Sequence, residues 1–167
     1  FGLLNYQDLP KPAFFAYKFL NQLGDTQLRC ADPAAFVCRD QAGAVQALFW
    51  DFTITNTGSK VNNQVFYKAD QPSKPTSDAE LKFTGLKKGA YRLVATKVGY
   101  RANDVQSAWR DLGSPSQLTR TQVETLRTAC TGAAVIDETV RIGADGRYLL
   151  RFPMRENDVW LVELRPR

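Results

Sequence analysis

Residues 134–164 read AVIDETVRIGADGRYLLRFPMRENDVWLVEL, and this stretch carries the clearest signal of the fold class. Three of its segments alternate apolar and polar residues, as half-buried β-strands do: 134–142, 147–152 and 159–164. The dipeptide Asp145-Gly146 separates the first two segments, and a turn at 155–158 precedes the third. Asp-Gly between two alternating runs is among the strongest hairpin signals. The stretch therefore predicts a meander of antiparallel strands.

The same period of two recurs upstream of this stretch. Further strands are predicted at 35–39, 44–54, 79–83 and 90–98. The first two form a predicted hairpin, in which AVQALFWDFTI is a long central strand. Residues 56–80 are polar and predict either a long loop or a weak edge strand around 64–68.

Two short helices interrupt the predicted strands. Asn103 or Asp104 can cap the first helix, and Gly113 ends it. Thr119 and Gln122 form a capping box in front of the second helix. Seven or eight short antiparallel strands with two inserted helices predict a mainly β fold, an antiparallel β-sandwich.

A further helix precedes the sandwich. Residues 12–23 read PAFFAYKFLNQL, with Pro12 in the first helical turn. Four aromatic rings lie at different angles around this helix: Phe14, Phe15, Tyr17 and Phe19. They cover far more than the single apolar stripe of an ordinary surface helix. We therefore expect the helix to dock against protein outside the sandwich as well.

Length and composition exclude several classes of protein. The 167 residues suffice for about one domain, and no window approaches about 18 consecutive apolar residues, which argues against a membrane-spanning helix. The sequence starts at Phe1, so we expect an interior or processed piece. Histidine is absent, which excludes a Ser-His-Asp triad and the usual imidazole metal sites. We expect neither a metal nor a cofactor.

The net charge of +5 is spread along the chain, with acidic residues interleaved. Only Lys87-Lys88 and the tail of Arg165 and Arg167 are dense in positive charge. A nucleic-acid footprint requires basic residues gathered on one face. A solvated, slightly basic surface is therefore favoured over nucleic-acid binding.

The chain has three cysteines, which is an odd number, and their spacing does not suit a metal site. Cys130 falls at an apolar helical position and is predicted to be a small core residue. A disulfide between Cys30 and Cys38, across two neighbouring extended segments, is left open. The cysteine count does not decide the redox compartment.

Paired carboxyl groups can cleave a glycosidic bond with retention of configuration when they lie about 5 Å apart. Asp137 and Glu138 are adjacent on a predicted strand, so their side chains point to opposite faces. Asp51 is a candidate buried acid, although a place at the rim of a strand is favoured. Glu156 and Asp158 belong to a predicted turn, where they bond the local backbone. No catalytic residue is predicted.

Exposed tryptophans could instead form a flat platform for sugar rings. The candidates are Trp50, Trp109 and Trp160. Each is in phase with apolar neighbours, as Trp50 is with Leu48 and Phe52, so core packing is favoured. Substrate-binding residues are left unknown.

Several strings resemble glycoside hydrolase family 39, the family of β-xylosidases and α-L-iduronidase. Residues 1–24, FGLLNYQDLPKPAFFAYKFLNQLG, are similar to the segment that forms the last helix of the family's catalytic barrel. The other strings resemble the accessory β-sandwich of its bacterial β-xylosidases: ALFWDFT (47–53), GAYRLVATKV (89–98), RANDVQSAW (101–109), LGSP (112–115), LTRTQVETLR (118–127) and RENDVWLVEL (155–164).

The resemblance implies a two-part organisation. Residues 1–24 would be the final helix segment of a (β/α)8 barrel, and 25–167 the accessory sandwich. The family's acid/base and nucleophile glutamates lie on earlier barrel strands, and nothing here matches their motifs, so no catalytic role is carried over. Gln106 stands where family members often have Tyr, which puts any role of that ring in doubt.

The parent enzyme implied by this resemblance removes terminal β-xylosyl units with retention. Its barrel would be the partner of this chain, and the parent would bind the xylo-oligosaccharide substrate. A periplasmic or secreted location is favoured for it, with no nucleic acid and no membrane as partners. The alternative is an independent carbohydrate-binding or interaction module, which would not need the helix at 12–23.

Overall fold

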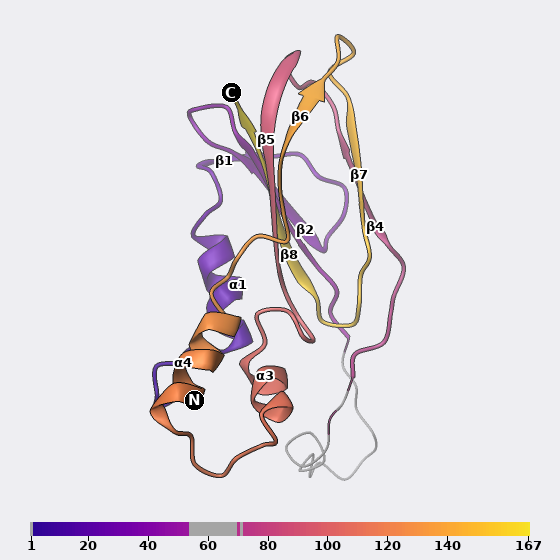
Figure 1. The fold of residues 1–167 in the computed structure, drawn as a ribbon. Helices are drawn as coiled ribbons and strands as arrows, with labels where there is room; N and C mark the ends of the chain where they lie inside the picture. Colours follow the sequence, from indigo (N-terminus) through magenta and orange to yellow (C-terminus); the bar gives the residue numbers. More distant parts are fainter. Residues whose placement is uncertain (1, 54–69, 71) are drawn as a thin grey trace.

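The computed structural model describes residues 2–53, 70 and 72–167. Two sheets face each other along most of the molecule, and α3 and α4 gather at one end of it (Figure 1). The elements in chain order are α1 (Pro12–Leu20), β1 (Thr26–Leu28), β2 (Ala35–Arg39), β3 (Val45–Trp50), β4 (Ala79–Phe83), β5 (Gly89–Val98), α3 (Val105–Asp111), α4 (Arg120–Ala129), β6 (Ile136–Ile142), β7 (Tyr148–Phe152) and β8 (Val159–Pro166). The predicted edge strand around 64–68 lies outside the described residues.

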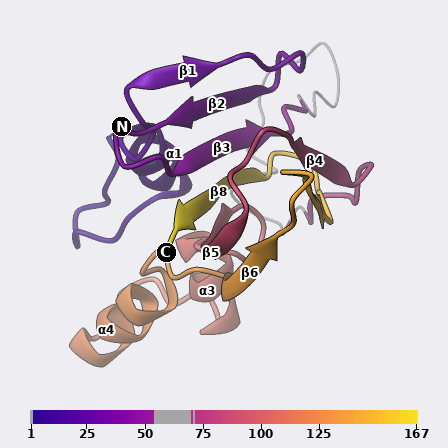
Figure 2. The same cartoon turned by 90° about the horizontal axis from the view of Figure 1, so that it is seen from above.

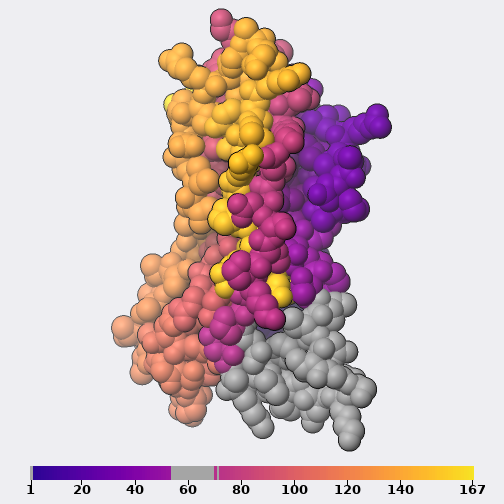
Figure 3. All heavy atoms as spheres, turned by 90° about the vertical axis from the view of Figure 1, so that its right-hand side faces the viewer, coloured from indigo at the N-terminus to yellow at the C-terminus, as the bar shows by residue number. Residues whose placement is uncertain are grey.

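The sandwich is unequal. Its large sheet has the strand order β1-β2-β3-β8-β5-β6, whereas β4 and β7 form a two-stranded sheet, and every pairing is antiparallel. Figure 2 shows the large sheet as a curved row of strands, and Figure 3 shows the face on which β4 and β7 lie. The predicted fold class, an antiparallel sandwich with two inserted helices, is confirmed.

The predicted meander is wrong in its pairing. β8 lies between β3 and β5, while β6 pairs with β5 and β7 pairs with β4. The turn at Asp145-Gly146 is therefore a corner that carries the chain from one sheet to the other. The apolar faces of β6 and β7 both belong to the core between the sheets, with Val140 and Ile142 on one side and Phe152 on the other. β6 thus contributes to the core from the large sheet, and β7 contributes from the small sheet that faces it.

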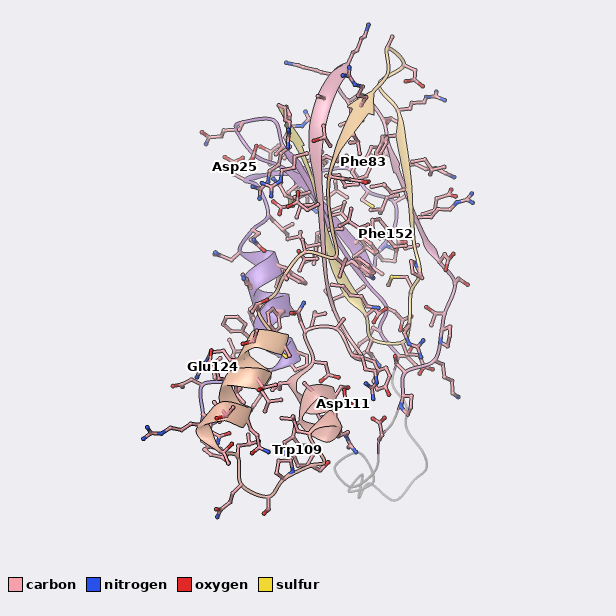
Figure 4. All side chains as sticks on the ribbon, in the orientation of Figure 1. Asp25, Phe83, Trp109, Asp111, Glu124 and Phe152 are labelled. Carbon is pink, nitrogen blue, oxygen red and sulfur yellow. The ribbon has the colours of Figure 1, made fainter. Side chains whose placement is uncertain are left out.

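Aromatic rings fill the space between the sheets. Phe152 lies 4.9 Å from Trp160 and 5.7 Å from Phe49, measured between ring centroids. The labelled side chains of Phe83 and Phe152 both lie between the two sheets in Figure 4. Trp160 is buried, which confirms the prediction of core packing for this residue.

A second apolar cluster covers the outer face of the large sheet. Phe15 and Phe19 of α1 pack there with Leu48, Leu161 and Cys130. The helix ends at Leu20, three residues before the predicted end at 23, and a turn follows it. The sandwich therefore covers one side of α1, and the opposite side of the helix faces away from the large sheet.

The caps predicted for the two short helices are both present. The Asp104 side chain accepts a hydrogen bond from the backbone N–H of Gln106 at the start of α3. Thr119 and Gln122 form a reciprocal capping box at the start of α4. Across the part of the chain that the structure describes, no helix is long and apolar enough to span a lipid bilayer.

Candidate functional site

Asp51 lies at the end of β3, at the rim of the sandwich. Its Oδ1 accepts hydrogen bonds from the Asn157 backbone N–H at 2.9 Å and from the Thr53 hydroxyl at 2.8 Å. The Asp51 backbone N–H donates to the carbonyl of Asp158. These bonds fasten the end of β3 to the turn before β8, so the favoured rim position is confirmed.

Two of the other acids singled out in the sequence, Asp137 and Glu156, also have partners that explain them. Asp137 accepts two hydrogen bonds from Arg92, at 2.8 and 2.6 Å, and these bonds hold its pKa below the usual value. Glu138 is exposed on the same strand. Glu156 accepts a hydrogen bond from the backbone N–H of Lys74 at 2.9 Å, and this bond holds the turn before β8 to the segment around Lys74. That the chain carries no catalytic residue stays a prediction.

Asp158 is a buried acid that the sequence analysis assigned only to a turn. Its side chain is 0% exposed, and its Oδ2 lies 2.7 Å from Nζ of Lys97, whose side chain is 14% exposed. Oδ2 also accepts the Arg155 backbone N–H at 2.8 Å, whereas Oδ1 has no hydrogen-bond partner among the described residues. Nζ of Lys97 also lies 5.4 Å from the centroid of the Trp160 ring.

A sequence signal for this pair exists, although it was missed. Along β5 the inward positions are Tyr91, Leu93 and Ala95, and Lys97 is the next position in the same phase. A lysine at an inward position of a strand requires an acid partner, because an unpaired buried charge is strongly disfavoured. The pair stabilises the turn between β7 and β8, and nothing connects it to a substrate.

The tryptophans do not form a common surface. Trp50 is partly buried against the outer cluster, with its ring 5.5 Å from that of Phe36. Trp109 is also partly buried, and its indole N–H donates to the Pro115 carbonyl at 3.0 Å. Phe52, in phase with Trp50 along the sequence, lies beyond the end of β3 and is exposed. Trp50 and Trp160 lie on the neighbouring strands β3 and β8 but on opposite faces of the large sheet, and Trp109 lies on α3, which agrees with a packing role.

The disulfide left open between Cys30 and Cys38 is not formed. Both thiols are free, Cys38 being buried and Cys30 exposed. Cys38 lies opposite Gln27 in the ladder, and Cys30 lies beyond the end of β1. Cys130 is buried as predicted, and burial together with the charge of Asp104 raises its pKa to about 11. Among the described residues, no group of three His, Cys, Asp or Glu side chains could hold a metal ion.

The most unusual surface feature lies at the N-terminal end. Five of the nine exposed large apolar side chains of the described residues fall within the first 20 residues: Leu3, Leu4, Tyr6, Tyr17 and Leu20. We call these five the N-terminal apolar group. Tyr17 is 62% exposed and Leu20 is 46% exposed, although Phe15 and Phe19 of the same helix are buried. The helix thus presents apolar side chains both to the sandwich and away from it.

A hollow of about 430 Å³ lies beside this group, between the N-terminal segment and the α3–α4 region. Its walls include Tyr6, Leu9, Trp109 and Leu126, and Gln106 borders it. Figure 4 shows Trp109 beside α3 at the helical end of the molecule. Soluble proteins rarely leave apolar residues clustered in this way unless another surface covers them. Tyr6 is the member of the N-terminal apolar group that lines this hollow.

Comparison with known proteins identifies the family of the chain. The sequence model of glycosyl hydrolases family 39 matches residues 1–148, so the chain belongs to this family. The β-xylosidase of Geobacillus stearothermophilus is 28% identical over 164 residues, which are 98% of this chain and 29% of that protein.

Two crystal structures agree closely with the fold. The family 39 enzyme from Xanthomonas axonopodis pv. citri is 36% identical with a TM-score of 0.90, and the match covers 99% of this chain and 32% of that one. A monomeric β-xylosidase from Caulobacter crescentus CB15 is also 36% identical, with a TM-score of 0.89 and coverage of 99% and 33%. The chain thus spans about a third of the length of these relatives.

Proposed function

We propose that this chain is the C-terminal, non-catalytic third of a β-xylosidase-like enzyme, and that the sandwich buttresses the enzyme's catalytic barrel. Two observations support this proposal. Residues 1–148 match family 39, and the whole chain spans only about a third of the length of its relatives. In this proposal residues 1–24 form the final helix segment of the barrel, and residues 25–167 form the accessory domain. The whole enzyme removes terminal β-xylosyl units with retention of configuration.

The N-terminal apolar group supplies the physical reason for the buttress. Fully burying a large apolar side chain stabilises by about 1.5–3 kcal/mol. Because Tyr17 and Leu20 are already partly covered, completing their burial contributes about 1–2 kcal/mol each. Leu3, Leu4 and Tyr6 add to this sum. A barrel that packs on this side of α1 thus gains several kcal/mol of apolar burial.

The chemistry is assigned to the barrel because retention needs two facing carboxylates about 5 Å apart. Four of the five acids that the sequence singled out have other roles: Asp51 and Glu156 bond turns, Asp137 pairs with Arg92 and Asp158 pairs with Lys97. The fifth, Glu138, is exposed on β6 beside Asp137. A nucleophile and an acid/base supplied by the remaining two thirds of the protein are consistent with this arrangement.

Hydrolysis of an aryl β-xyloside tests the assignment directly. The full-length protein that contains this chain should release the aryl group, whereas the chain alone should release none above the buffer. Turnover that persists with the purified chain would contradict the non-catalytic role. Absence of turnover by the full-length protein, toward this and other aryl glycosides, would contradict the glycosidase assignment.

Substitutions on α1 test the docking surface. In the full-length protein, Tyr17→Ser with Leu20→Ser should lower the thermal midpoint and reduce β-xyloside turnover, because both side chains lie under the barrel. Leu149→Ser is the matched control, since Leu149 is an exposed apolar residue on β7 of the small sheet. Equal effects from the α1 pair and the control would show that the barrel does not contact this face of α1.

The competing reading, an independent carbohydrate-binding module, makes a different prediction. Trp160 is buried, and Trp50 and Trp109 are partly covered by their own chain. We therefore expect no saturable change in tryptophan fluorescence when the chain is titrated with neutral xylo-oligosaccharides. Saturable binding at millimolar or lower concentration would favour the binding module over the buttress.

A further inference from the structure

The two dense basic spots of the sequence meet at one end of the sandwich. Lys87 and Lys88 lie in the turn that leads from β4 into β5. Arg167 follows β8, and its backbone N–H donates to the carbonyl of Ala90 near the start of β5, at 3.0 Å. Arg39, the last residue of β2, borders the same place. Three separate segments of the chain thus bring positive charge together.

These residues surround a hollow of about 430 Å³, which we call the basic hollow. Its charged lining consists of four side chains, Arg39, Lys87, Lys88 and Arg167, and no carboxylate side chain is part of it. Ala42 and Pro166, which are both exposed, contribute apolar surface to the lining, whereas Val45 and Tyr91 are buried beneath it. The hollow lies at the end where β5 begins and β8 ends, which is opposite to α3 and α4 (Figure 1).

Among the described residues, the four cations are not part of the ion pairs that hold several other basic side chains. Within the described residues, Arg92, Arg151 and Arg165 each form an ion pair with a carboxylate. None of the four lining cations does so with any described acid. The charge of Arg167 contributes to the lowered pKa of Asp137, but both carboxylate oxygens of Asp137 accept hydrogen bonds from Arg92.

A concave site lined by one sign of charge concentrates its field and attracts ions of the opposite sign. Guanidinium groups match the planar fork of a carboxylate, and ammonium groups add strong charge-assisted bonds. The volume falls in the range of small-molecule sites, of about 300–1,000 Å³, and suits one or two sugar rings rather than a folded partner. Apolar surface beside the cations suits the carbon face of a sugar ring.

We propose that the basic hollow binds the carboxylate of a uronic acid unit in an acidic saccharide. The choice of a sugar acid over another anion rests on the proposed function, since the parent enzyme handles glycans. The four cations bind the carboxylate, and Ala42 and Pro166 lie against the ring. The site would hold acidic substituted chains on the enzyme at a distance from the barrel, without a part in bond cleavage.

Calorimetric titration of the full-length protein tests this proposal with three probes. They are a xylo-oligosaccharide that carries one glucuronic acid unit, a neutral xylo-oligosaccharide of the same length, and inorganic phosphate. The acidic oligosaccharide should show a binding event that the neutral one lacks. Raising sodium chloride from about 0.05 to about 0.5 M should weaken this event, because salt screens exposed charges.

Two double variants locate the site. Lys87→Gln with Lys88→Gln should weaken the acid-specific event about tenfold or more, since each removes a charge-assisted contact. Lys74→Gln with Lys82→Gln removes the same charge from exposed positions outside the hollow and should leave binding unchanged. All four lysines are exposed, so both variants are expected to fold, and thermal unfolding checks this.

Three outcomes would overturn the proposal. The first is equal binding of the acidic and neutral oligosaccharides, and the second is equal loss of binding in the two double variants. The third is phosphate binding as tight as that of the acidic oligosaccharide, which would mean a general anion site without saccharide recognition. The aryl β-xyloside assay is independent of all three, so failure of the proposed glycosidase activity is recognised separately.

Discussion

Replacing Lys97 by Met should destabilise the fold far more than replacing a lysine in an exposed ion pair. Met keeps most of the apolar stem of the side chain but removes the charge that faces Asp158. Nζ of Lys97 lies 2.7 Å from Oδ2 of Asp158, and the Asp158 side chain is 0% exposed. Removing one partner of a buried pair leaves an uncompensated charge and costs about 3–5 kcal/mol.

The lower part of this range is expected, because the Lys97 side chain is 14% exposed and Asp158 keeps its bond from the Arg155 N–H. In a chain of this size each kcal/mol lowers the thermal midpoint by about 2–4 °C. The Lys97→Met variant should therefore melt about 6–12 °C below the unchanged chain.

Lys82→Met is the matched control. Nζ of Lys82 lies 2.6 Å from Glu80, so the separation resembles that of the buried pair, but the lysine side chain is 73% exposed. Exposed pairs contribute about 0–1 kcal/mol. Adding Asp158→Asn to Lys97→Met should restore part of the lost stability, because no buried charge is then left without a partner.

Urea unfolding of the three variants, followed by tryptophan fluorescence, measures these differences. Trp160 lies beside the pair and reports its surroundings. A loss below about 1 kcal/mol for Lys97→Met, equal to that of Lys82→Met, would refute the reasoning. Such a result would mean that solvent reaches Asp158 and that burial does not set the strength of the pair.

Two further predictions concern single side chains. At about pH 8 a thiol reagent should modify the exposed Cys30 first, because burial raises the pKa of Cys38 and, to about 11, that of Cys130; Cys30→Ser should abolish the fast phase. Arg92→Gln should raise the pKa of Asp137, measured by NMR titration, because the hydrogen bonds of Arg92 hold it down. A depressed pKa stabilises the folded state only above the range in which the acid titrates, so the stability difference between this variant and the unchanged chain should shrink as the pH falls through that range.

Local signals in the sequence were sufficient for most elements. The alternation in 35–39, 79–83 and 90–98 predicted β2, β4 and β5, and the caps at Asp104 and Thr119 placed α3 and α4. These signals come from residues close together in the sequence, and such residues determine where a helix or strand begins and ends. They do not decide which strands pair.

The candidate site was harder to predict because it depends on contacts between distant residues. The four aromatic rings of α1 indicated a helix with two packing sides, and Tyr17 is indeed exposed while Phe15 and Phe19 are buried. The buried charge of Asp158 escaped notice, because its partner Lys97 is far away in the sequence. The basic hollow likewise arises from segments that only the folded chain brings together.

The Asp145-Gly146 turn also depends on a contact with a residue far away in the sequence, Leu86. Gly146 has a φ of 64°, and a Cβ there would lie 2.6 Å from the carbonyl oxygen of Leu86. In a simple hairpin, alanine would cost only the strain of the left-handed backbone, about 1–2 kcal/mol. At a corner between two sheets it must also push away the 85–86 turn, whose Leu86 N–H donates to the Gly146 carbonyl.

Gly113→Ala separates these two contributions, because Gly113 has a φ of 84° and open space where a Cβ would lie. Its loss of stability should reflect backbone strain alone, whereas Gly146→Ala should lose clearly more in urea unfolding. Equal losses would mean that the corner yields without cost and that the 85–86 turn is not held against it. The extra loss expected at Gly146 comes from its contact with the segment between β4 and β5, which an Asp-Gly dipeptide considered as a local turn signal does not contain.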